Sequence, residues 1–310
     1  MSYLDRIARC HRWNPEDYLP FLVDGRPLGM VARDSLDLLR GFPEVFAVAD
    51  GSVGETSVAL APRLMGFEAR SAALAAVLEG LRAERGAFPA WRGEDYPIAP
   101  RWGEAPLFKM ERAAVPFFGL PAYGVHVNGF VRRAEGLAVW VGRRSLRKQT
   151  APGKLDHLTA GGQPYGLGLM ENVIKECGEE AGVPPALAAR AVPVGAVKYR
   201  CAMPDGLRND VAFCYDLELP EDFVPQNRDG EMESFELWPL ERALAVVRDS
   251  EAFKFNVALV TIDFALRHGV LDPDSEPDYQ AIVEGIGGSI SPGTAVGGRR
   301  ADSRSGAAAG

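Results

Sequence analysis

Three glutamates that lie close together in the segment "ENVIKECGEEAGVP" are the residues best suited to chemistry in this sequence. Glu176, Glu179 and Glu180 have the i, i+3, i+4 spacing that makes side chains neighbours on a helix surface. The lack of proline between 169 and 181, followed by Gly182, predicts a helix there. A divalent cation such as Mg²⁺ would turn the repulsion between these carboxylates into coordination.

A solvated acidic face is the simplest alternative for three glutamates on one helix. The predicted helix also has a separate apolar face, made of Met170, Val173, Ile174, Cys177 and Ala181. The residues around the glutamates favour a ligand site instead, because a glycine pair precedes the helix and a lysine precedes the first glutamate.

The run "GG…KECGEEAGV" resembles the Nudix box, a motif of glycines, glutamates and an arginine. Lys175 stands where that motif has arginine, and Gly161 takes the place of its first glycine. Leu167 stands where the first glutamate is usual, so Glu171, one turn before Lys175, is the candidate substitute that braces the loop.

A longer resemblance covers residues 5–285 and includes "GRRSLRKQTAPGKLDHLTAGGQPYG" and "DVAFCYDLELPEDFVPQNRDGEMESFELWPL". These segments are similar to the Nudix subgroup of plant plastid Nudix hydrolases and of the Nudix part of fungal thiamine pyrophosphokinase fusions. The resemblance implies a hydrolase that uses Mg²⁺ (or Mn²⁺) to cleave an organic diphosphate. Thiamine diphosphate and its damaged oxo- and oxy- forms are the implied substrates.

The resemblance also implies roles for individual residues. Glu176, Glu179 and Glu180 would be the metal ligands and catalytic carboxylates, and Lys175 would orient them by charge pairing. Lysine lacks the planar fork of arginine and holds carboxylates less rigidly. In the later segment "DGEMESFELW", Glu233 is preferred over Glu231 as a further catalytic carboxylate, against the alternative of a solvated loop residue.

A basic run precedes the glycine pair and consists of Arg143, Arg144, Arg147, Lys148 and Lys154. Its alternatives are a solvated loop and a set of phosphate contacts. We predict that Arg143 and Arg144, and then Lys148, bind the substrate together with Gly161 and Gly162. His126 and His157 are expected to be a strand-face and a loop histidine, because neither has a paired carboxylate in the sequence pattern.

The elements that must position these residues form two units. Residues 1–118 contain a predicted hairpin at Asp24-Gly25 and a helix in "ARSAALAAVLEGLRAERG", typical of a small α+β accessory domain. Residues 119–285 alternate strands and helices without a regular βαβ repeat. The expected fold class is α/β (α+β), a Nudix α/β/α sandwich with a mixed sheet, and residues 286–310 are expected to be a disordered tail.

The composition limits the class of partner. The net charge is −8, so no overall positive field exists to attract nucleic acid or an anionic membrane. The cysteines show no CxxC pair, which favours free thiols in a reducing compartment. We therefore expect a cytoplasmic enzyme that binds a small-molecule diphosphate, with a homodimer as a further expectation.

Two other functions compete with hydrolysis. The run "RKQTAPGKLDHLTAGG" also resembles Nudix-type isopentenyl diphosphate isomerases. Those enzymes use a cysteine near this segment, whereas the nearest thiol in this sequence is Cys177, on the apolar face of the predicted helix. A catalytically silent Nudix scaffold is the other alternative, suggested by Leu167 and Lys175. The presence of all three helix glutamates argues against it.

Overall fold

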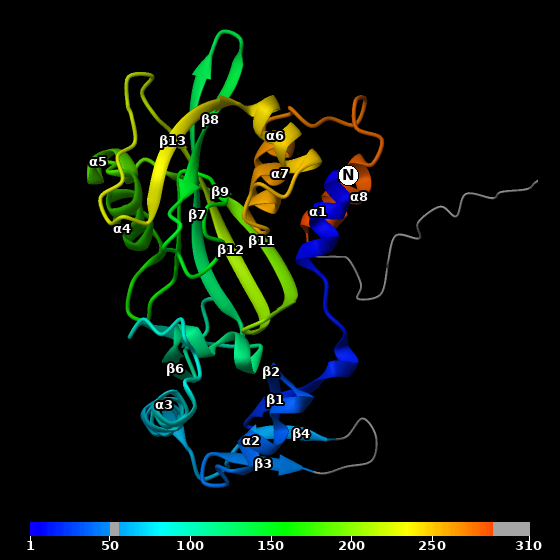
Figure 1. The fold of residues 1–310 in the computed structure, drawn as a ribbon, viewed down its shortest axis with the longest axis vertical. Helices are drawn as coiled ribbons and strands as arrows, with labels where there is room; N and C mark the ends of the chain where they lie inside the picture. Colours follow the sequence, from blue (N-terminus) through cyan, green and yellow to red (C-terminus); the bar gives the residue numbers. More distant parts are fainter. Residues whose placement is uncertain (50–55, 288–310) are drawn as a thin grey trace, which may run out of the picture.

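The computed structural model describes residues 1–49 and 56–287, so the tail predicted from residue 286 lies almost wholly outside the described residues. Figure 1 shows a large body built around one sheet and a smaller unit below it, formed by residues from the first third of the sequence.

The large body is organised by a seven-stranded mixed sheet. Its strands are β7 (Ala122–Arg133), β8 (Gly136–Arg144), β9 (Leu155–Asp156), β10 (Thr159–Gly162), β11 (Val192–Met203), β12 (Gly206–Glu218) and β13 (Met232–Pro239). The order is β11-β12-β7-β8-β13, with β10 paired to β7 and β9 to β8. Strands β12 and β7 run parallel, and the other pairs are antiparallel. The expectation of a mixed sheet is confirmed.

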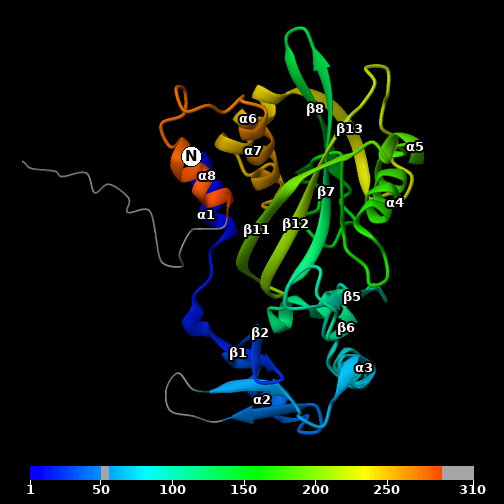
Figure 2. The same ribbon diagram turned by 180° about the vertical axis from the view of Figure 1, so that it is seen from behind.

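Helices cover both faces of this sheet (Figures 1 and 2). The first face carries α4 (Leu169–Ala181) and α5 (Pro185–Ala188), whose apolar side chains pack on Val125 and Val127 of β7. The second face carries α1 (Tyr3–Cys10), α6 (Leu240–Asp249), α7 (Val257–Arg267) and α8 (Tyr279–Ile286). The large body is therefore the expected α/β/α sandwich.

The smaller unit is an α+β structure with its own apolar core. Strands β1 (Tyr18–Val23) and β2 (Arg26–Ala32) form the predicted hairpin, and Asp24 and Gly25 take positive φ angles in its turn. The remaining elements are β3 (Phe46–Ala49), β4 (Ser57–Leu60), β5 (Asp95–Ile98), β6 (Phe108–Glu111), α2 (Leu36–Arg40), α3 (Gly66–Arg85) and the 3₁₀ turns η1 (Pro15–Asp17), η2 (Arg33–Ser35), η3 (Arg112–Ala114) and η4 (Pro116–Phe118).

Helix α1 packs with the large body, although the predicted division at residue 118 counts it with the smaller unit. Ile7 is fully buried in the core beneath α6 and α7. The Nε atom of Arg6 donates to the Val247 carbonyl of α6 at 2.9 Å. The smaller unit therefore consists of residues that follow α1, while the boundary at 118/119 stays a prediction.

The smaller unit touches the end of the sheet at which β7 begins and β12 and β11 are joined. The Tyr165 amide donates to the Asp95 carbonyl at 2.8 Å. Gly206 leaves no room for a side chain, because a Cβ there would lie 2.2 Å from the Pro116 carbonyl oxygen. In the part of the chain described, no helix is long and apolar enough to cross a membrane.

Candidate active site

Helix α4 holds the glutamates in the predicted segment. Its first turn is capped by Glu171, whose carboxylate accepts from the Gly168 amide at 2.8 Å. It ends at Gly182, which takes the left-handed φ of 64° that glycine adopts without strain. Val173 and Cys177 are fully buried, so the opposite side of the helix faces away from the apolar core.

Glu180 is the most deeply buried of these glutamates, with 3% of its surface exposed. Its carboxylate accepts from the Thr159 hydroxyl at 2.7 Å and from the Ala160 amide at 3.0 Å, both on β10. Burial raises the pKa of Glu180 to about 7. The site thus holds a carboxylate whose negative charge is costly unless a cation lies beside it.

Glu176 lies one turn earlier and faces the same strand. A Cβ atom at Gly161 would lie 2.2 Å from the Glu176 carboxyl carbon, so this glycine makes room for the carboxylate. Burial also raises the pKa of Glu176. Glu176 and Glu180 therefore present two carboxylates to one strand.

Glu179 points elsewhere, with half of its side chain exposed. The Lys175 ammonium donates to Glu179 at 2.8 Å and to Glu176 at 3.0 Å. Burial alone would lower the pKa of Lys175, but these two hydrogen bonds outweigh it and raise that pKa. The structure gives Lys175 the contacts that an orienting residue needs.

The donor set fits a hard divalent cation in its chemistry. The carboxylates of Glu176 and Glu180 flank β10, and oxygen ligands of this kind are those that Mg²⁺ prefers. Within residues 1–49 and 56–287, no three His, Cys, Asp or Glu side chains are already gathered as a metal site. Glu179 would have to leave Lys175 to complete the predicted trio.

The residues of the basic run differ in where they lie, because β8 ends at Arg144 and the loop that follows carries Lys148. Lys148 lies 3.8 Å from the Glu180 carboxylate and also contacts Glu231. Burial lowers the pKa of Lys148 to about 8. Of the three predicted phosphate contacts, Lys148 is therefore the one beside the glutamates.

Arg143 and Arg144 point to opposite sides of β8, because side chains alternate along a strand. Arg144 is buried and each of its three guanidinium nitrogens has a protein partner: the group pairs with Asp156 at 2.7 Å and donates to the Thr150 carbonyl at 2.8 Å and the Ala151 carbonyl at 3.2 Å. Arg143 is exposed and donates to the Gly153 carbonyl at 3.1 Å. The structure thus brings Arg144 to the site as a support and leaves Arg143 outside it.

The two later glutamates have different partners. Glu231 contacts Lys148, whereas the Glu233 carboxylate is exposed and accepts from the Leu146 amide at 3.2 Å. Glu231 therefore lies closer to the Glu180 end of the site than the preferred Glu233.

The loop before α4 is braced without the glutamate that Leu167 replaces. The Gln163 side chain, 1% exposed, donates to the Leu167 carbonyl at 2.6 Å. Asn172 donates to the Gln163 side chain at 3.1 Å and to the Gly162 carbonyl at 2.8 Å. Glu171 caps the helix as described, so the bracing role is shared by three residues, two of which the sequence pattern did not indicate.

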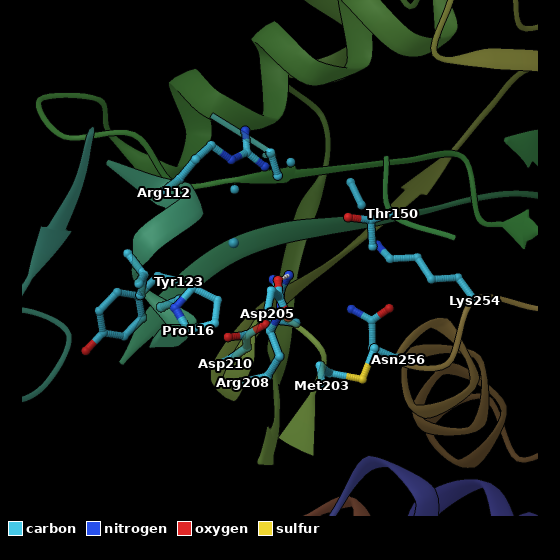
Figure 3. A pocket seen from close by; sticks show the side chains of 18 of the residues that line it. Arg112, Pro116, Tyr123, Thr150, Met203, Asp205, Arg208, Asp210, Lys254 and Asn256 are labelled. Carbon is cyan, nitrogen blue, oxygen red and sulfur yellow. Dashed lines mark hydrogen bonds and ion pairs between the residues drawn. The ribbon is translucent and has the colours of Figure 1, made fainter. Parts of the chain in front are cut away.

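A cavity of about 200 Å³ opens beside β10 (Figure 3). Ala160, Gly161 and Gly162 line it, so the predicted glycine pair belongs to its wall. Six basic residues and two aspartates also line it, namely Arg92, Arg112, Arg144, Lys148, Arg208, Lys254, Asp205 and Asp210. An acidic protein thus concentrates cations in this cavity, which suits an anionic ligand.

Sequence reasoning missed most of these basic residues. Figure 3 shows Arg112 on one side of the cavity and Lys254 across it. Each comes from a segment without a basic cluster or motif, and only the folded chain brings them together.

The opposite end of the cavity carries hydrogen-bond acceptors. The Tyr199 hydroxyl donates to Asp210 at 2.6 Å and accepts from the Asn256 amide at 3.0 Å. Asn256 is 4% exposed, and its Oδ1 atom has no partner among the described residues. Buried polar atoms are nearly always paired, so this oxygen is an unsatisfied acceptor on a residue that lines the cavity.

The histidines form a buried pair. His126 Nδ1 and His157 Nε2 are 3.0 Å apart, and His126 lines the cavity. Burial lowers both pKa values, to about 4 for His157, despite the neighbouring Asp156. His126 lies on β7 and His157 lies in the connection between β9 and β10, both as expected, and both side chains are buried.

Known proteins resemble this chain along most of its length. Residues 2–122 match a family described as a domain of unknown function, DUF4743. Nudix hydrolase 20, chloroplastic, and Nudix hydrolase 24, chloroplastic, both from Arabidopsis thaliana, are each 42% identical over 280 residues. These matches cover 88% and 90% of this chain and 75% of each relative. Among solved structures, that of DR0079 from Deinococcus radiodurans matches 54% of this chain and 97% of its own, with 21% identity and a TM-score of 0.43.

Proposed function

Because this chain belongs to the Nudix hydrolase family, enzymes that cleave diphosphate anhydrides, we propose that it hydrolyses an organic diphosphate in the cavity beside β10. The observation that carries the proposal is the position of Glu180. Its buried carboxylate lies 3.8 Å from Lys148 and accepts from the Ala160 amide, and both of these residues line a cavity rich in cations.

The proposed metal is Mg²⁺ (or Mn²⁺), held by Glu176 and Glu180, with Glu179 as the third ligand. When bound, such a cation polarises phosphoryl oxygens and lowers the pKa of a coordinated water. Thr159 and the Ala160 amide fix the Glu180 carboxylate, and Lys175 orients Glu176. The cations of the cavity would bind the phosphate oxygens and offset charge that develops there.

The proposed substrate is thiamine diphosphate or its damaged oxo- and oxy- forms, yielding the monophosphate and phosphate. Support comes from the resemblance of long segments to the subgroup that contains thiamine pyrophosphokinase fusions. The acceptors at the far end, including Asn256 Oδ1, suit an organic group that carries hydrogen-bond donors.

Isomerisation of isopentenyl diphosphate has little support from the cavity. No cysteine is among the residues that line it. Cys177 is fully buried on the apolar side of α4, and burial raises the pKa of its thiol to about 12. The thiol nearest in sequence to the glycine-rich strand is therefore out of reach of a substrate.

The test is Mg²⁺-dependent phosphate release from the three thiamine compounds, with ADP-ribose, NADH and isopentenyl diphosphate alongside. Glu176→Gln and Glu180→Gln should each lower kcat at least about a hundredfold, because each removes a charged ligand of the proposed metal. Glu84→Gln, on an exposed face of α3, is the matched control and should keep full activity. Inactivity on every thiamine compound would refute the substrate, and unchanged turnover in both variants would refute the site.

A further inference from the structure

The unit between α1 and β7, matched by a family whose function is unknown, forms one wall of the catalytic cavity. The residues from this unit that line the cavity are Ala90, Arg92, Tyr96, Arg112, Ala113, Val115 and Pro116. Two of them are arginines, and they lie in separate segments, one before β5 and one after β6.

We infer that this unit supplies phosphate-binding residues to the active site, and that Arg112 and Arg92 contact the diphosphate of the substrate. The inference rests on the proposed function for the identity of the ligand. The positions of Arg92 and Arg112 in the cavity wall are observed and do not depend on that function.

A single carboxylate fixes the two arginines relative to each other. Glu111, 4% exposed, accepts from the amides of Arg92 at 3.0 Å, Gly93 at 2.8 Å and Glu94 at 3.1 Å. It also accepts from the Ala113 amide at 3.2 Å. The backbone that carries Arg92 and the backbone that carries Arg112 therefore move as one piece.

The Arg112 guanidinium retains free donors. Its Nη1 atom pairs with Glu94 at 2.5 Å, and the group lies 5.2 Å from the centre of the Tyr96 ring. Its Nε and Nη2 atoms make no hydrogen bond to any described residue. Arg144 is the useful contrast, because all three of its nitrogens already have protein partners. Arginine with free donors in a cavity is suited to the planar, bidentate recognition of phosphate.

Arg92 differs from Arg112 in having no side-chain partner at all among the described residues. It is exposed at the mouth of the cavity. The backbone of Arg92 is fixed by Glu111, while its guanidinium is free to bind an anionic ligand that enters from solvent.

The part of the cavity wall that carries Arg92 and Arg112 contacts β10, the strand beside the proposed metal ligands. A Cβ atom at Gly162 would lie 1.4 Å from the Tyr96 hydroxyl, so this tyrosine packs against the backbone of β10. The adjacent Gly161 makes room for Glu176 from α4, whereas Gly162 makes room for Tyr96 from the smaller unit. An anionic ligand bound beside β10 would therefore contact both the smaller unit and the proposed metal site.

The test compares Arg112→Ala, Arg92→Ala and Arg112→Lys with Arg85→Ala, a control on an exposed turn of α3 in the same unit. The first readout is the dissociation constant for inorganic pyrophosphate with Mg²⁺, measured by calorimetry on the full chain. The second is KM and kcat for whichever diphosphate the enzyme hydrolyses. Arg112→Ala and Arg92→Ala should each weaken pyrophosphate binding and raise KM, by about tenfold for Arg112. Arg112→Lys should recover part of the loss, because it keeps the charge without the fork.

Unchanged pyrophosphate affinity in both alanine variants would overturn the inference, and so would a wild-type chain that does not bind pyrophosphate. These outcomes are separate from those of the proposed function. A chain that hydrolyses no thiamine compound, yet loses pyrophosphate affinity in the arginine variants, keeps the phosphate-binding wall and loses only its substrate. If Arg112→Ala fails to fold, exposed Arg92 decides the matter alone.

Discussion

The Glu176 carboxylate occupies the space in which a side chain at Gly161 would stand. The two residues come from different elements, α4 and β10, and lie fifteen positions apart in the sequence. A glycine that a motif would assign to phosphate binding is thus also required by the carboxylate behind it.

Gly161→Ala should abolish most activity while the fold persists. The new methyl group would lie 2.2 Å from the carboxyl carbon of a flexible side chain, which can move aside. Glu176 would then lose its position, and kcat should fall at least about tenfold, because a displacement of about 1 Å can cost that much or more. Steady-state kinetics and a thermal melt measure the two effects separately.

Gly80→Ala is the control for this substitution. It lies in α3 with open space around it, so alanine should raise helix stability slightly and leave kcat unchanged. Full activity of Gly161→Ala would mean that the position of Glu176 has no part in turnover.

Gln163→Ala should loosen the loop that precedes α4. Its removal leaves the Leu167 carbonyl without its side-chain donor and one N–H of the Asn172 amide without its acceptor, while the other N–H keeps the Gly162 carbonyl. Each unpaired buried group costs about 1–3 kcal/mol, so chemical denaturation should show a lower free energy of unfolding. Leu167→Ala should cost less, because the hydrogen bond at this residue uses its backbone. An equal loss in both variants would assign the brace to the leucine side chain.

The buried histidine pair predicts a loss of stability at acid pH. The unfolded chain protonates His157 below about pH 6.5, whereas in the folded chain its pKa is about 4. Between these values the unfolded state binds more protons, so the contribution of His157 to the free energy of unfolding falls as the pH drops. From pH 7 to pH 5 the loss should be about 2 kcal/mol.

Glu180 acts in the opposite sense, because its raised pKa lets the folded state hold an extra proton in the same range. The His157 contribution is therefore read from the difference between wild type and His157→Gln in denaturation at pH 7 and pH 5. A difference that does not change with pH would contradict the assignment of His157 as buried and neutral.

Asn256→Leu should change which organic group the cavity prefers. Leucine keeps the approximate volume and removes the unpaired Oδ1 acceptor. A ligand with a ring amino group should then bind several-fold more weakly, since a lost hydrogen bond is worth about 0.5–1.5 kcal/mol. Thiamine diphosphate, which has that amino group, and oxythiamine diphosphate, which has an oxo group, give the comparison. If the substitution weakens the binding of both compounds equally, or of neither, the Asn256 side chain does not contact the ring amino group.

The sequence pattern located the helix of the site more accurately than its surroundings. Residues 169–181 carry both a helical period and a motif, and the helix and its glycine stop are confirmed. Glu179 departs from Glu176 and Glu180, because on α4 it lies farther from the apolar face formed by Val173 and Cys177, and it pairs with Lys175. Arg143 and Arg144 are adjacent in sequence, yet the alternation of β8 sends only Arg144 to the cavity.

The set of residues that lines the cavity could not be predicted from the sequence, because it depends on the topology of the fold. Arg112, Lys148 and Lys254 lie 36 and 106 residues apart along the chain, in segments that share no motif. Their convergence depends on how the smaller unit docks on the end of the sheet and on the turn before α7. Neither follows from local periodicity.

Helix α1 has a consequence for how the smaller unit is attached. The chain leaves α1 on the large body, builds the smaller unit, and returns at β7, so that unit is anchored at both of its ends. It is an inserted module, even though it precedes the sheet in sequence. Cutting the chain at residue 118 would strip α1 from α6 and α8, whereas joining residue 12 to residue 120 across a short linker would spare that core. The module is thus tied to the large body on both sides of the segments that carry Arg92 and Arg112.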